Sequence, residues 1–233
     1  MQNCFASGRK ATKIPARMLT AISTAHDAGV GIYGDYNDLE CLHEAIHHLC
    51  QHPNVEGHLG EFALGLAYDV RKSFEGARET KFFGTGRERV KYFGVKILWP
   101  FYLVQVGLLR DFAKVQPTSA IHHSQLYLLE HVTEKALAEK NPDTARFCRE
   151  WLSHFPGLTR DFITLFIEEE TYKFVFKTPP KKRLQGLPGF LRSFHWFSDE
   201  YRAFEKEVRT EAKKQGCPPQ SLGLKRDWPD FKW

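Results

Sequence analysis

An HExxH pattern at residues 43–47 is the sharpest chemical motif in the chain. His43 and His47 lie four residues apart, so on a helix both rings reach one zinc ion, and Glu44 would act as general base for a bound water. No third ligand follows by pattern, and the candidate is Glu61 on the next predicted helix. Because the segment is rich in histidine, adventitious metal binding and solvated or interface histidines remain as alternatives.

Two arginines that follow could bind an anion. Arg71 and Arg78 could hold a phosphate or carboxylate by bidentate hydrogen bonds. They could equally form a buried ion-pair network with Asp35 and Asp38, and we favour this structural interpretation.

Basic residues concentrate at the two ends of the chain. Residues 1–17 carry four Lys or Arg and no acid, and residues 173–233 carry fourteen Lys or Arg against seven Asp or Glu, whereas the middle is acidic. In the C-terminal region aromatics alternate with cations, a pattern typical of single-stranded nucleic acid binding. The alternative is that these aromatics pack on the domain. The candidate partner-binding residues are Lys181, Lys182, Arg183, Arg192, Trp196 and Arg202.

The elements that position these residues follow from apolar spacing and turn chemistry. The sequence predicts two short strands joined near residues 26–29, which would form a hairpin. A strand over 90–99, with Gly94 as a bulge, leads into a buried helix that begins at Pro100.

Helices are also predicted over residues 39–51, 58–74, 119–140, 141–155, 159–176 and 194–214. Asp38, Ser119, Asn141 and Thr159 are the expected caps of the helices that they begin. The proline- and glycine-rich run 178–189 is predicted to be a linker, and tryptophans near the end of the chain indicate docking on this protein or on a partner.

Composition bounds the class of protein. Of 233 residues 42% are hydrophobic and 19 are Phe, which is enough for a packed core and excludes global disorder. No apolar run is long enough for a membrane span, and the first residues lack the apolar segment of a signal peptide. Five cysteines without CxxC spacing argue against a zinc ribbon or a disulfide framework. We therefore expect a cytoplasmic protein.

Three stretches carry a resemblance to a known family. They are residues 32–39 (IYGDYNDL), residues 67–79 (AYDVR through GARE) and residues 97–112, which begin with ILWP. Over about residues 28–140 the chain resembles an uncharacterised bacterial family, a domain of unknown function. The resemblance implies a bacterial origin and no activity, and the basic C-terminal region is expected to lie outside it.

These observations predict an α+β fold that is predominantly α-helical, with a small N-terminal sheet packed on a helical core. The expected division is a globular domain over residues 1–177 and a basic linker, helix and tail over 178–233. The leading hypothesis is a non-enzymatic binding or scaffold protein within a larger assembly, without a cofactor, whose C-terminal arm contacts nucleic acid or an acidic protein. The alternatives are a zinc-dependent hydrolase built on the HExxH pattern and a homo-oligomeric structural protein without a ligand.

Overall fold

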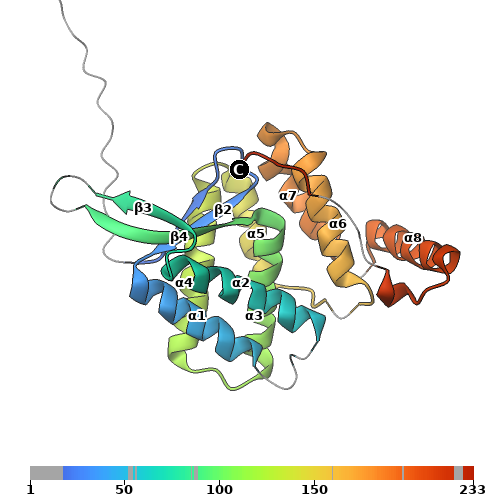
Figure 1. Cartoon of the computed structure of the whole chain (residues 1–233), viewed down its shortest axis with the longest axis horizontal. Helices are drawn as coiled ribbons and strands as arrows, with labels where there is room; N and C mark the ends of the chain where they lie inside the picture. The colour runs from blue at the N-terminus through green and yellow to red at the C-terminus, as the bar shows by residue number, and fades with distance from the viewer. Residues whose placement is uncertain are drawn as a thin grey trace, which may run out of the picture.

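The computed structural model describes residues 18–51, 55, 57–84, 86, 89–158, 160–195, 197–222 and 228–233. Its sheet is antiparallel, with strand order β1-β2-β4-β3 (Figure 1). The strands are β1 (Thr20–Ser23), β2 (Gly29–Gly34), β3 (Glu79–Phe83) and β4 (Val90–Leu98). The fold is α+β and predominantly helical, and the predicted N-terminal hairpin is confirmed as β1 and β2.

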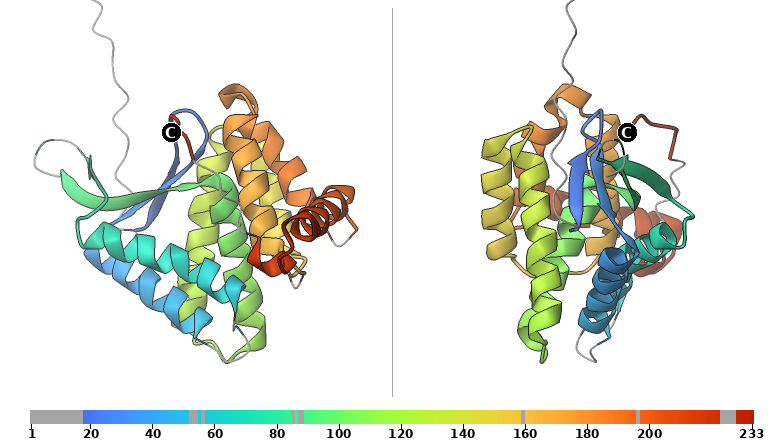
Figure 2. Two further views of the ribbon diagram at one scale, coloured as in Figure 1. Left: turned by 45° about the vertical axis from the view of Figure 1, so that its right-hand side comes forward. Right: turned by 90° about the vertical axis from the view of Figure 1, so that its left-hand side faces the viewer.

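Two helices form a layer beside the sheet. Helices α1 (Tyr36–Cys50) and α2 (His58–Phe74) lie side by side in both Figure 1 and Figure 2. The expected cap of α1 is corrected, because Asp35 caps the helix and Asp38 is the third helical residue. The Asp35 carboxylate accepts from the Asp38 N–H at 2.9 Å, and the Asp38 carboxylate accepts from the Asp35 N–H at 3.2 Å. This reciprocal capping box starts the helix three residues earlier than predicted.

The predicted central unit is confirmed as β4 followed directly by α3 (Trp99–Val115), with Pro100 in its first turn. Helix α3 is buried over most of its length. The predicted bulge at Gly94 is wrong, because the residue pairs in regular register with Tyr33 and Glu79. Gly94 is instead required by packing, since a Cβ there would lie 2.0 Å from the Tyr33 ring.

A helical hairpin covers another side of α3. Helices α4 (Ala120–Ala138) and α5 (Pro142–Ser153) lie side by side in Figure 2. The side chains of Ser119 and Asn141 cap them as predicted, by accepting N–H groups of the first turns. A buried hydrogen bond of 2.6 Å joins the hydroxyls of Tyr102 on α3 and Thr133 on α4.

The C-terminal part adds α6 (Ile163–Phe176), the short 3-10 helix η3 (Pro180–Lys182), α7 (Arg183–Arg192), α8 (Asp199–Gln215) and the 3-10 helix η4 (Pro219–Ser221). The predicted cap Thr159 lies outside the described residues. The predicted linker is wrong for residues 180–189, because α7 and η3 occupy them. Leu184 and Leu187 of α7 are buried in the core, and the Thr144 hydroxyl of α5 donates to the Leu184 carbonyl at 3.0 Å.

The tail docks on the protein itself. The Trp228 ring lies 6.2 Å from Phe101, 5.9 Å from Tyr172 and 5.7 Å from Phe176. Further on, the Trp233 carbonyl accepts a hydrogen bond of 3.0 Å from the His26 N–H in the β1–β2 turn. Among the helices of the described residues, none combines the length and the apolar character that crossing a bilayer requires.

Candidate nucleic-acid interface on the C-terminal helices

Helix α8 has one buried side and otherwise faces solvent. Its apolar residues recur every three or four positions, and Tyr201 and Phe204 pack with ring centroids 5.1 and 5.3 Å from Phe166 of α6. Ser198 caps its start and Gly216, at φ 65°, ends it. Figure 1 shows α8 at the edge of the molecule, far from the sheet. Most charged side chains of this helix are therefore exposed.

The charges of α8 are sorted by side. Arg202, Lys206, Arg209 and Lys213 follow the spacing i, i+4, i+7 and i+11, which places them in one row along the helix; we call this row the basic stripe. All of them are exposed. At 1.5 Å per residue the basic stripe is about 16 Å long. Glu207 and Glu211 lie on another side, so the helix is basic along one edge although its net charge is zero.

Two members of the basic stripe contact acids. Arg209 donates to Glu205 at 2.7 Å and to Asp161 at 3.3 Å, and the Glu205 bond raises the pKa of Arg209. Arg202 lies 4.0 Å from Asp199. Exposed pairs of this kind contribute little to stability, so a bound phosphate could replace them at low cost.

The other two members are unpaired. Across the described residues, Lys206 and Lys213 make no ion pair. An exposed aromatic side chain stands at the start of the stripe: Phe197 is 71% exposed, and the Arg202 guanidinium lies 5.7 Å from its ring centroid. A row of cations with an aromatic ring at one end provides both phosphate contacts and a surface for base stacking.

The predicted partner-binding residues differ in their exposure to solvent. Lys181, Lys182, Arg192 and Arg202 are exposed, although the Arg192 guanidinium lies 4.7 Å over the Phe147 ring. Trp196 lies outside the described residues. The prediction for Arg183 is wrong, because this residue is buried.

Arg183 is buried, with 5% of its surface exposed. Its guanidinium donates to the His26 carbonyl at 2.8 Å and to the Val175 carbonyl at 2.7 Å. Arg183 therefore joins α7 to α6 and to the β1–β2 turn and cannot reach a partner. A basic run in the sequence does not by itself show which of its side chains is buried. The neighbouring apolar residues Leu184 and Leu187 could have indicated that Arg183 lies on the buried side of a helix.

Each of the two predicted anion-binding arginines pairs with a different acid, and anion binding by them stays a prediction. Arg71 lies 3.6 Å from Glu75, and Arg78 lies 2.8 Å from Asp69. The expected buried network of these arginines with Asp35 and Asp38 is wrong, because those two side chains cap α1 and the pairs of both arginines are surface contacts.

The HExxH residues lie on α1 as the spacing predicts. The His43 and His47 rings are 4.4 Å apart, and the His43 ring packs edge-on against Phe74 at 5.8 Å. Burial there lowers the pKa of His43. Glu44 is exposed.

The third ligand is not in place. The Glu61 side chain is 80% exposed and lies 3.7 Å from His58. In the part of the chain that the structure describes, no group of three His, Cys, Asp or Glu side chains is arranged to hold a metal ion. The zinc hydrolase stays a prediction without a complete ligand set.

Nearly all of the described chain matches one protein-family model. The match is to a domain of unknown function (DUF6904) and runs over residues 19–233. The chain belongs to this family. No curated protein and no solved structure matches it.

The extent of the DUF6904 match corrects one expectation. The predicted resemblance ended near residue 140, and the basic C-terminal region was expected to lie outside it. The DUF6904 match instead includes α7, α8 and the tail. The basic stripe therefore lies inside the DUF6904 domain.

Proposed function

We propose that this DUF6904 protein is a non-enzymatic binding protein that holds single-stranded nucleic acid along the basic stripe of α8. The observation that carries the proposal is the row of four exposed cations at i, i+4, i+7 and i+11. Such a row can contact successive phosphates of an extended strand without reading its sequence. The exposed Phe197 ring adds a stacking surface at one end.

The test is a filter-binding titration of the full chain with a labelled oligonucleotide at several salt concentrations. Four phosphate contacts predict that log K falls against log salt with a slope of about −3 for a single strand. The triple variant Arg202→Gln/Lys206→Gln/Lys213→Gln should bind at least about tenfold more weakly, with a slope near −0.7. Arg209 is retained in this variant because it also pairs with Asp161.

The matched control removes three exposed cations from the helical body, in Lys114→Gln/Lys135→Gln/Arg146→Gln. It changes net charge equally and should keep both the affinity and the slope. Absence of binding by the unaltered chain, or an equal loss in the control, would overturn the proposal.

A further inference from the structure

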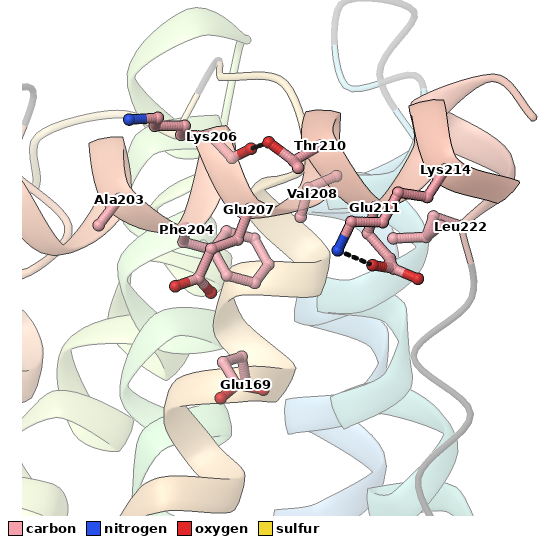
Figure 3. A pocket seen from close by; sticks show the side chains of 10 residues that line it. All are labelled: Glu169, Ala203, Phe204, Lys206, Glu207, Val208, Thr210, Glu211, Lys214 and Leu222. Carbon is pink, nitrogen blue, oxygen red and sulfur yellow. Dashed lines mark hydrogen bonds and ion pairs between the residues drawn. The ribbon is translucent and has the colours of Figure 1, made fainter. Parts of the chain in front are cut away.

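A groove runs between α8 and α6 and adjoins the basic stripe, since Lys206 lies on the edge of both. Its volume is about 640 Å³. Phe204 and Val208 of α8 and Leu222, which follows η4, form apolar walls and are themselves nearly buried. Figure 3 shows α8 crossing above α6 with these side chains directed into the gap. We call this space the acidic groove, after the side chains of Glu169, Glu207 and Glu211 in its lining.

Carboxylates line the acidic groove. Glu207 and Glu211 lie one turn apart on α8, and Glu169 lies opposite on α6. In Figure 3 the Glu207 carboxylate extends across the gap toward Glu169, whereas the amine of Lys206 points away from it. Lys206 and Lys214 also line the groove, so its three carboxylates exceed its two lysines by one negative charge.

The cations near the acidic groove neutralise it incompletely. Lys214 lies 3.4 Å from Glu211, and Lys173 lies 3.5 Å from Glu169. Glu207 has no ion pair among the described residues. A ligand that brings a positive charge beside Glu207 thus gains an interaction that the protein itself does not supply.

We propose that the acidic groove binds a basic amphipathic peptide segment of a partner protein. A lysine or arginine of the segment lies at Glu207, and a neighbouring leucine-type side chain covers Phe204 and Leu222. Charge complementarity selects this occupant, because nucleic acid and acidic peptides are repelled by the same carboxylates. The volume accommodates a few side chains, so the contact is a short segment and not a whole domain face.

The test uses fluorescence anisotropy of the full chain with a labelled synthetic peptide in which leucine and lysine recur at helical spacing. A peptide with glutamate in place of lysine is the ligand control. Glu207→Gln/Glu211→Gln should weaken binding of the lysine peptide about tenfold, because it removes the carboxylate beside the peptide cation and a second negative charge of the groove. Glu139→Gln/Glu150→Gln removes two exposed carboxylates elsewhere and should leave it unchanged.

A second variant tests the groove itself. Ala203 lies on its exposed wall, so Ala203→Arg fills the entrance with a cation without altering the core. It should abolish peptide binding while the melting temperature and nucleic-acid binding are retained, which separates this proposal from that for the basic stripe. No binding of the lysine peptide, equal binding of the glutamate peptide, or unchanged affinity in both groove variants would overturn it.

Discussion

Replacing Arg183 with methionine tests whether a cation of the basic run supports the fold. The variant keeps most of the apolar stem and removes the guanidinium that donates to the carbonyls of His26 and Val175. Two hydrogen bonds from a charged donor contribute about 3–5 kcal/mol together. The Arg183 Nε atom is buried with no hydrogen-bond partner among the described residues. Removing it relieves a desolvation cost of about 1–2 kcal/mol in the folded state. The net expected loss is about 2–3 kcal/mol.

The assay is thermal unfolding followed by circular dichroism. For a chain of this size a loss of about 2–3 kcal/mol lowers the melting temperature by roughly 4–12 °C. Arg183→Lys should fall between the variant and the unaltered chain, because an ammonium on a shorter side chain reaches only one of the two carbonyls. Lys182→Met is the control, since Lys182 is exposed and should change stability by about 0.5 kcal/mol or less. A melting temperature for Arg183→Met equal to that of the control would refute this account of the buried arginine.

Two further predictions concern the sheet and the histidines. Gly94→Ala should destabilise the protein by about 2–3 kcal/mol in chemical denaturation, because the new methyl group would overlap the Tyr33 ring; an unchanged midpoint would contradict this packing. His122 stacks on His48 at 4.1 Å, and burial followed by the neighbouring His48 charge lowers the pKa of His122. A lowered pKa means that the folded state binds the proton less well, so stability is present above pH about 6.5 and is lost as pH falls through the folded-state pKa. In urea titrations at several pH values, His122→Gln should reduce the loss of unfolding free energy at acid pH. His58→Gln, at an exposed site, should leave that loss unchanged. An equal pH dependence of the unfolding free energy in the unaltered chain and both variants would show that His122 does not cause it.

Local signals in the sequence predicted much of the helical core. The caps Ser119 and Asn141 followed from side chains that act within one helical turn, and the full extent of α2 followed from its apolar spacing. Elements that depend on distant contacts were missed. Prolines and glycines in residues 178–189 indicate a linker on local grounds, yet burial of Leu184 and Leu187 against other helices stabilises α7.

The predictions of functional sites were also correct within one helix and failed where several elements must come together. Helical spacing correctly placed His43 and His47 side by side, because both lie on one element. It could not place Glu61, whose position relative to them depends on how α2 packs. The acidic groove was missed because it needs residues from α6, α8 and the segment after η4. Sorting the charges of α8 by helical angle would have indicated its acidic side.

The backbone of His26 is held at both ends by residues that come late in the chain. Its N–H donates to Trp233 and its carbonyl accepts from Arg183, 157 positions away. During synthesis from the N-terminus, these two bonds of the β1–β2 turn can form only after residues 183 and 233 have been made. Chain closure over such separations is slow, so the earliest strands should gain their final protection against solvent exchange among the last steps of folding.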